Sequence, residues 1–190
     1  MDADKELIDR CLQNDSSAHE ELYKRHAARM YGICLRYAGD VLEAQDILQE
    51  GFIKVFQQLK QFRYRGSFEG WLRRIFINTA ITLANRELKF SRREELTPHL
   101  GASGEELEGL FRLSQQELLR LIQQLPAGYR TVFNLYVVEG YSHREIASML
   151  KISVNTSKSQ LFSAKKKSQG KINQRRIWQR KRTIIILLSE

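Results

Sequence analysis

The chain has 190 residues, which is enough for one domain or for two small ones. Its 31 lysine and arginine residues outnumber 22 acidic residues and give a formal net charge of +9, which indicates a polyanionic partner such as a nucleic acid. The two cysteines, Cys11 and Cys34, lack the clustering of a zinc site or a disulfide framework. Because no apolar run approaches the roughly 20 residues of a membrane span and MDADKELIDRCLQ lacks a signal arrangement, we expect a cytoplasmic protein without a membrane span.

Nearly the whole chain has the residue pattern of α-helices. Both prolines, Pro98 and Pro126, lie outside the long helical patterns, and alternating runs of β-branched residues are scarce. The first half predicts helices over about 4–13, 18–37 and 42–61, with a stop and a new cap at residues 14–17. The fold class is therefore expected to be all-α.

The predicted helix over 42–61 has two distinct faces. One face is apolar at three- and four-residue spacing and is expected to pack in a core. The other face places a branched apolar side chain, Ile53, within a polar row of Asp46, Gln49, Glu50 and Gln57. This row is either a solvated face with one isolated isoleucine or a surface on which a helix of a partner protein docks. The periodicity alone leaves both interpretations open.

The segment that follows combines aromatic and arginine residues. Residues 62–86 contain five aromatic residues and five arginines against one acid, Glu69. The aromatic residues of the predicted helix, such as Trp71, fall at helical spacing, so packing in a core explains most of them. Packing does not explain the loop before the helix. Rings and guanidinium groups on a loop can stack on unpaired bases and bind phosphates, so the arginine loop (residues 63–68) is a candidate single-strand nucleic-acid site.

A change of composition separates the two halves of the chain. Residues 94–108, EELTPHLGASGEELE, contain five acids and no lysine or arginine. This composition predicts a flexible acidic linker between two separately folded small domains. The linker is either merely solvated or an imitation of a nucleic-acid strand that enters a positively charged channel.

Two short helices joined by a tight turn are predicted in the second half. Ser142 and Glu145 have the spacing of a capping box that opens a helix through Leu150, and Ser153 is expected to cap a second helix over about 154–167. This pair is typical of a helix-turn-helix, whose second helix enters the major groove of DNA, although a helical hairpin that binds no DNA shares the pattern. The candidate base and phosphate contacts on the second helix are Asn155, Thr156, Lys158, Ser159, Lys165, Lys166 and Lys167.

These segments resemble the sigma factors of bacterial RNA polymerase, in the extracytoplasmic-function (ECF) group of the sigma-70 superfamily. The matching stretches are EAQDILQEGFIKVFQQLKQF, FEGWLRRIFINTA, LPAGYRTVFNLYVVEGYSHREIASML and ISVNTSKSQLFSAKKK. They follow the family's order and spacing over about residues 5–168. The resemblance implies a region 2-like domain over residues 1–90, a linker over 91–113 and a region 4-like helix-turn-helix domain over 114–169.

The resemblance also implies a role for each candidate surface. The docking strip (Asp46, Gln49, Glu50 and Ile53) would bind the clamp helices of the largest catalytic subunit of the polymerase, and the flap of the second-largest subunit would be a further partner. The minus-ten element would be melted and its non-template strand held by Arg63, Tyr64, Arg65, Ser67, Phe68, Arg74 and Asn78. The minus-thirty-five element would be read as duplex DNA by Ser153, Asn155, Thr156, Lys158, Ser159, Lys165 and Lys166.

The chain departs from the family pattern at several positions. Family members often carry arginine where this chain has Gln160 and Ser163, and they usually end soon after the recognition helix. This chain instead continues over residues 170–190 with a basic and then apolar tail, to which the sequence assigns no role.

No catalytic motif, phosphate-binding glycine loop or metal-ligand cluster occurs in the sequence. We therefore expect an initiation factor without catalytic residues, metal or cofactor, which acts in the bacterial cytoplasm and on the nucleoid when bound to polymerase. An anti-sigma factor is a further partner that the resemblance allows. The competing interpretation is a helix-turn-helix regulator that binds duplex DNA without docking on polymerase. Such a regulator would have no use for the docking strip or the arginine loop.

Overall fold

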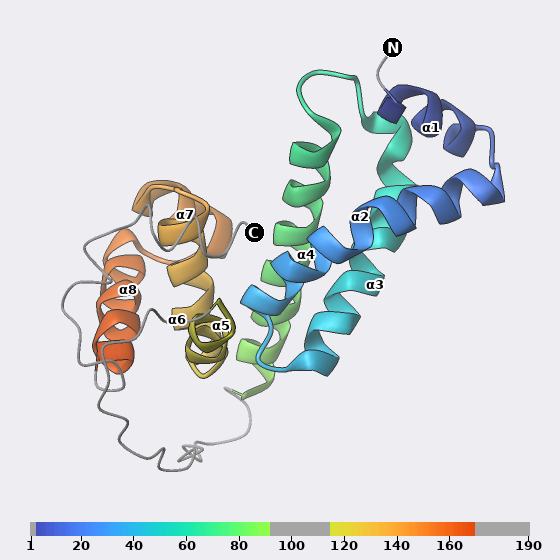
Figure 1. Ribbon diagram of the computed structural model, residues 1–190. Coiled ribbons are helices and arrows are strands. Elements are labelled where there is room, and N and C mark those ends of the chain that lie inside the picture. Colours follow the sequence, from blue (N-terminus) through green and yellow to red (C-terminus); the bar gives the residue numbers. More distant parts are fainter. Residues whose placement is uncertain (1–2, 92–114, 170–190) are drawn as a thin grey trace. The chain divides into compact units, whose positions relative to one another are not determined.

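The computed structural model describes residues 3–91 and 115–169, which lie in helices and in the short connections between them (Figure 1). The predicted linker and tail fall largely on residues 92–114 and 170–190, which lie outside the described residues. The chain divides into two compact units, residues 1–83 and 84–190, and helix α4 (Phe68–Ser91) crosses this boundary. The predicted all-α fold is confirmed. No helix within the described ranges is long and apolar enough to cross a membrane.

The first unit contains α1 (Ala3–Leu12), α2 (Ser16–Tyr37), α3 (Val41–Gln58), the 3-10 helix η1 (Leu59–Gln61) and most of α4. Carboxylate caps open α2 and α3. Asp15 accepts hydrogen bonds from the backbone N–H groups of Ser17 and Ala18 at 2.9 and 3.2 Å, and Asp40 accepts one from Glu43 at 2.8 Å. These caps pair N–H groups that a helix start leaves unsatisfied. Hydrogen bonds from the side chains of Ser17 and Arg10 also hold the pKa of Asp15 well below its usual range.

The apolar faces of α2, α3 and α4 supply the core of the first unit. α3 and α4 approach closely at Gly51, where an added Cβ atom would overlap the ring of Phe76. The Phe76 ring has little room to move, because it is fully buried and packs edge-on against Phe52 with ring centroids 5.2 Å apart. The largest fully buried side chains of this core include Leu22, Met30, Tyr37, Ile47, Leu72 and Phe76.

Replacing Gly51 with alanine is expected to destabilise the first unit by about 1–3 kcal/mol, because overpacking outweighs the better helix propensity of alanine. Gly32→Ala on α2 is the matched control. No atom lies within 4 Å of a Cβ at Gly32, so only the propensity changes. That variant should gain about 0.5–1 kcal/mol. Thermal unfolding of both variants measures the difference, and equal Tm shifts would contradict the close approach of α3 and α4.

The second unit contains α5 (Gln115–Gln123), α6 (Ala127–Phe133), the π-helical segment η2 (Asn134–Val138), α7 (His143–Leu150) and α8 (Val154–Gln169). The buried Arg130 donates hydrogen bonds to the carbonyl oxygens of Gln123 and Leu125 at 2.9 and 3.1 Å, which ties the end of α5 to α6. The predicted capping box is confirmed, since Ser142 and Glu145 each accept a hydrogen bond from the backbone N–H of the other. The core of this unit includes Leu118, Ile122, Phe133, Leu135, Ile146, Leu161 and Ala164.

Candidate functional site

The arginine loop connects η1 to α4 on the surface of the first unit. Arg63 and Arg65 are exposed, and Tyr64 between them is 45% exposed. Tyr64 has a left-handed backbone with φ of 56°, and Gly66 follows with φ of 94°, so the chain turns sharply here. The Tyr64 hydroxyl donates a hydrogen bond of 2.9 Å to Asp9 of α1. Partial burial and this hydrogen bond raise the pKa of Tyr64 to about 12, so its hydroxyl remains a neutral donor at physiological pH.

Phe68 lies in the packing beneath the loop. It is 5% exposed, its ring stacks on Trp71 with centroids 5.6 Å apart, and it contacts the rings of Phe62 and His26 at 5.2 and 5.5 Å. A ring covered in this way offers no face to a base in the free protein, which favours a packing role over the predicted DNA contact of Phe68. Ser67 is exposed, and its Oγ accepts a hydrogen bond of 3.1 Å from the backbone N–H of Gly70 near the start of α4.

Arg74 and Asn78 are both exposed on α4. Because they are four residues apart, they lie on the same face of the helix. Thr82 extends this row by another turn, and its hydroxyl donates a hydrogen bond of 2.8 Å to the backbone carbonyl of Asn78. The arginine loop leads directly into α4. Exposed arginine side chains of the loop are therefore followed, along the chain, by the exposed arginine and asparagine of this row.

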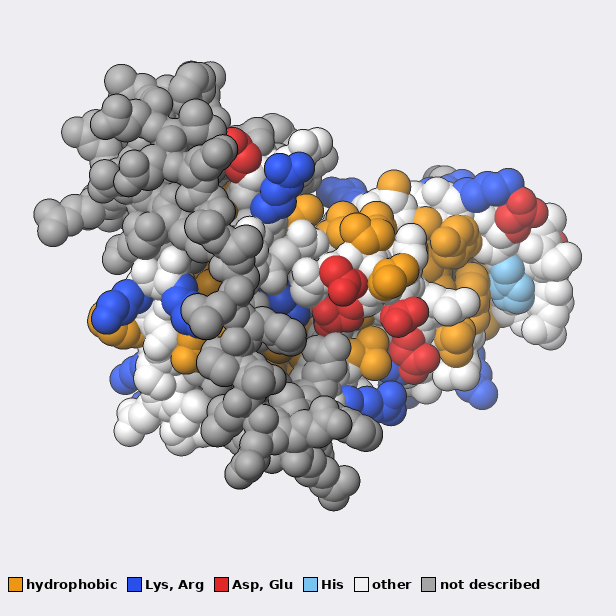
Figure 2. All heavy atoms as spheres, turned by 90° about the horizontal axis from the view of Figure 1, so that it is seen from below, with side chains coloured by type: hydrophobic (Ala, Val, Ile, Leu, Met, Phe, Trp, Pro, Cys, Tyr) orange, Lys and Arg blue, Asp and Glu red, His pale blue; other side chains and the backbone are white. Residues whose placement is uncertain are grey.

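The docking strip runs along α3, whose opposite face is buried. Asp46 and Gln49 are exposed, and Ile53 is 47% exposed. Leu42 lies one turn before Asp46 and is 71% exposed, which sequence analysis missed because an apolar residue at the start of a helix gives no sign of its exposure. Figure 2 shows acidic side chains beside apolar ones on the first unit. The strip therefore combines apolar and acidic character on one helix face.

Glu50 differs from the rest of the docking strip because it is half-buried and has partners in the first unit. Its carboxylate pairs with Lys54 at 3.4 Å, and Lys54 donates a hydrogen bond of 3.3 Å to Thr79 of α4. A partly exposed ion pair of this kind stabilises a protein by less than about 1 kcal/mol. The ion pair with Lys54 therefore holds Glu50 only weakly.

The turn between α7 and α8 has the geometry of a helix-turn-helix. Lys151 ends α7 in the left-handed conformation with φ of 53°, and the N–H of Ile152 donates a hydrogen bond of 3.1 Å to the carbonyl of Ala147. Ser153 Oγ accepts a hydrogen bond of 2.9 Å from the backbone N–H of Thr156, which confirms it as the cap of α8. The hydroxyls of Ser153 and Thr156 also lie 2.8 Å apart and bond to each other.

The outward face of α8 carries most of the predicted duplex contacts. Asn155, Lys158 and Ser159 are exposed in its first two turns. Phe162 lies on the same face and is 70% exposed, although sequence analysis did not single it out. Near the end of the helix, Lys165 is half-buried and Lys166 is exposed.

The inward face of α8 is held against α7. His143 of α7 and the buried Ser157 of α8 share a hydrogen bond of 2.9 Å between Nδ1 and Oγ. The ring of Tyr136 stacks on His143 with centroids 4.5 Å apart. Ser157, Leu161 and Ala164 are all buried, so they mark the inward face of α8, and the residues on the opposite side face outward.

These features define an all-helical basic protein with a helix-turn-helix in one unit and an exposed, arginine-rich loop in the other. Residues 22–89 match the family model for sigma-70 region 2, and residues 115–167 match that for sigma-70, region 4. The chain is 32% identical over 179 residues to the RNA polymerase sigma-H factor of Pseudomonas aeruginosa, covering 87% of this chain and 91% of that protein. It is 30% identical over 182 residues to the ECF RNA polymerase sigma-E factor of Escherichia coli, covering 89% and 94%.

The chain therefore belongs to the sigma-70 family of RNA polymerase sigma factors, in the ECF group. Among solved structures, it is similar to the sigma factor RpoE in complex with the anti-sigma factor NepR from Bartonella quintana, with a TM-score of 0.49 and 17% identity. That comparison covers 82% of this chain and 98% of that chain.

Proposed function

We propose that this sigma factor binds core RNA polymerase, directs it to specific promoters and helps to melt the minus-ten element. The observation that carries the proposal is the exposure of basic and amide side chains on the arginine loop and on α4, the helix that directly follows it. Arg63, Arg65, Arg74 and Asn78 are exposed, whereas Phe68 is buried against Phe62, Trp71 and His26. A protein that only binds duplex DNA has no need of such a surface.

The energetics of strand capture are consistent with this surface. Unstacking and extruding a base costs a few kcal/mol. Stacking of a base on an aromatic ring contributes about 1–3 kcal/mol, and Tyr64, which is 45% exposed, would supply such a ring. The guanidinium groups of Arg63 and Arg65 flank this ring in sequence and would bind the phosphates. Arg74 and Asn78 would then hold the extruded bases of the non-template strand.

The second unit would read the minus-thirty-five element as duplex DNA through α8. Asn155 and Ser159 carry hydrogen-bonding groups toward base edges, and Lys158 and Lys166 carry charges for phosphates. Ser153 and Thr156 would reach the backbone from the start of the helix. Division of the work between the two units lets one protein recognise both single-stranded and double-stranded DNA.

The docking strip would contact the clamp helices of the largest catalytic subunit, with Ile53 and Leu42 as apolar contacts and Asp46 as a partner for a basic residue. The flap of the second-largest subunit would be a further contact, and an anti-sigma factor would act by covering these surfaces. The protein would work in the cytoplasm, and on the nucleoid within the holoenzyme. The chemistry of RNA synthesis would belong to the core enzyme, so the sigma factor itself needs no catalytic residue or cofactor.

In-vitro transcription tests this function directly. Core polymerase is supplied with the protein and a library of genomic fragments, and the 5′ ends of the transcripts are sequenced. We expect start sites that share two elements at fixed spacing and that are absent with core enzyme alone. No specific initiation above the core enzyme would reject the proposal. Binding of duplex fragments without initiation would favour the helix-turn-helix regulator instead.

Replacing Lys158 with alanine tests the duplex contact. Loss of one phosphate contact should weaken holoenzyme binding to every promoter about equally and lower the slope of log affinity against log salt by about 1. Asn155→Ala, on the same helix face, is the matched control. It should weaken binding in a sequence-dependent manner and leave the salt slope unchanged. A salt slope unaltered by Lys158→Ala would remove this residue from the interface.

A further inference from the structure

Helix α1 lies beside the arginine loop and contacts its central residue. Asp9 accepts the 2.9 Å hydrogen bond from the Tyr64 hydroxyl, and the ammonium group of Lys5, one turn earlier, lies 5.9 Å from the centroid of the Tyr64 ring. The ring also packs on Phe62 with centroids 5.1 Å apart. The hydroxyl end of Tyr64 is thus bonded to another helix, while the residue as a whole remains 45% exposed.

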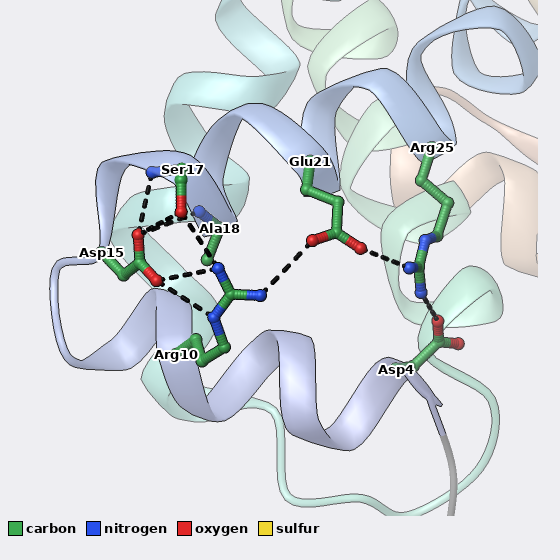
Figure 3. A network of polar contacts seen from close by, with 7 residues as sticks. All are labelled: Asp4, Arg10, Asp15, Ser17, Ala18, Glu21 and Arg25. Carbon is green, nitrogen blue, oxygen red and sulfur yellow. Dashed lines mark hydrogen bonds and ion pairs between the residues drawn. The ribbon is translucent and has the colours of Figure 1, made fainter.

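Helix α1 is itself fixed to α2 by a chain of charged groups (Figure 3). Arg10 of α1 pairs with Asp15 at 2.9 Å and with Glu21 of α2 at 3.4 Å. Glu21 also pairs with Arg25 at 2.6 Å, and Arg25 reaches back to Asp4 of α1 at 3.3 Å. Isolated surface pairs contribute little, but a connected network holds its members in one arrangement more effectively. The network therefore holds α1 in place, and with it the Asp9 carboxylate that contacts the loop.

The loop needs such support because its backbone conformation is unfavourable for its residues. Tyr64 has φ of 56°, and a bulky residue in the left-handed region costs roughly 1 kcal/mol or more. Without the hydrogen bond to Asp9, this residue would relax toward ordinary backbone conformations. The Tyr64 ring and the flanking Arg63 and Arg65 would then lose their common orientation.

We propose that Asp9 is a positioning residue for strand capture, which holds Tyr64 in its left-handed conformation and so preorganises the arginine loop. The inference rests on the proposed function of that loop. Asp9 touches no DNA in this proposal and acts through Tyr64. Preorganisation raises affinity because the binding-competent conformation is already populated, whereas an unsupported loop loses affinity by the fraction of time it spends in other conformations.

The test uses full-length variants in holoenzyme, on the strongest promoter from the start-site mapping, with the minus-ten region supplied as a pre-melted bubble. Asp9→Ala is expected to weaken binding of the bubble template about fivefold, the factor that corresponds to one lost hydrogen bond. Asp9→Asn retains an acceptor oxygen and should restore most of the affinity. Tyr64→Phe combined with Asp9→Ala should be no weaker than the weaker single variant, because both remove the same contact.

A second readout reports the loop itself in the free protein. Trypsin cleaves after Arg63 and Arg65 only when the loop opens, so Asp9→Ala should be cut there about fivefold faster than the wild type. Glu6→Gln removes a charge from an exposed position of the same helix and is the control for electrostatics. It should change neither readout. Thermal unfolding of each variant shows that the fold is retained.

The outcomes separate this inference from the proposed function. In one outcome, Arg65→Ala binds the bubble template more weakly, whereas Asp9→Ala binds it and is cleaved like the wild type. This result would overturn the positioning role of Asp9 and leave the loop as a DNA contact. Wild-type binding by Arg65→Ala would overturn the proposed capture function, and the positioning role with it. Tighter bubble binding by Asp9→Ala but not by Glu6→Gln would show that the contact restrains the loop, which also contradicts the proposal.

Discussion

Replacing Phe68 with alanine is expected to lower the free energy of unfolding of the first unit by about 3–5 kcal/mol. The ring is almost completely buried, and its removal leaves a cavity between Phe62, Trp71 and His26. None of these side chains can fill that cavity without leaving its own contacts. Urea unfolding followed by the fluorescence of Trp71, in a background with Trp178→Phe, measures the change because Trp71 stacks on Phe68.

Asn78→Ala is the matched control on the same helix. Its side chain is exposed, so the free energy of unfolding should change by no more than about 0.5 kcal/mol. It should nevertheless slow open-complex formation while core binding is retained. Phe68→Ala should reduce both stability and open-complex formation. If Phe68→Ala instead leaves the urea midpoint unchanged and abolishes melting, the ring contacts DNA and the packing role is wrong.

The pH dependence of stability provides a further check on this cluster. Burial lowers the pKa of His26 from its ordinary value of 6.5. In the unfolded chain, His26 therefore becomes protonated at a higher pH than in the folded chain. The free energy of unfolding falls as the pH drops below about 6.5. The cavity of Phe68→Ala admits water to His26 and reduces this difference. Between pH 7.5 and 5.5 the variant should therefore lose less stability than the wild type.

Local patterns predicted the all-α fold and the helix-turn-helix because helical periodicity and capping residues act within a few residues. The capping box at Ser142 and the cap at Ser153 are confirmed for this reason. These patterns do not fix the first residue of a helix where several capping residues are adjacent. The second helix begins at Ser16 rather than near residue 18, because Asn14 adopts φ of 62° and leaves Asp15 in place to cap it.

The roles of the loop aromatics could not be predicted in the same way. Tyr64 lies in the loop and Phe68 begins α4 four residues later, yet one is half-exposed and the other is buried. Residues distant in sequence contribute to this difference, since Asp9 of α1 binds the tyrosine hydroxyl and His26 of α2 packs edge-on against the phenylalanine ring, beside the local contacts of Phe68 with Phe62 and Trp71. A single sequence does not record which distant side chain faces a loop.

The exposure of apolar residues on the helices is equally hard to predict from a single sequence. Leu42 and Phe162 each have an apolar neighbour in sequence, Val41 and Leu161. Leu161 is buried and Phe162 is not, because only one face of α8 packs against α6 and α7. Val41 and Leu42 are both exposed at the start of α3. Only the tertiary structure shows that Leu42, one turn before Asp46, is exposed.

Replacing Ile53 with glutamate is expected to weaken binding to core RNA polymerase by about thirtyfold or more, the loss typical of a central apolar contact in an interface. Ile53 is 47% exposed in the free protein, so a charged side chain can be accommodated without disturbing the core. In a complex with the clamp helices, the same charge would have to be buried without a partner or would keep the surfaces apart. Fluorescence anisotropy of the labelled protein against core enzyme measures the affinity.

Leu12→Glu is the matched control, because Leu12 is 44% exposed and lies on α1 rather than on the docking strip. Both variants make the same chemical change at nearly the same exposure, so their Tm values should be similar. Only Ile53→Glu should lose core binding, and Leu42→Glu should weaken it to a smaller extent, because Leu42 lies at the end of the strip. Equal affinities for Ile53→Glu and Leu12→Glu would mean that the outward face of α3 is solvated and that the polymerase binds elsewhere.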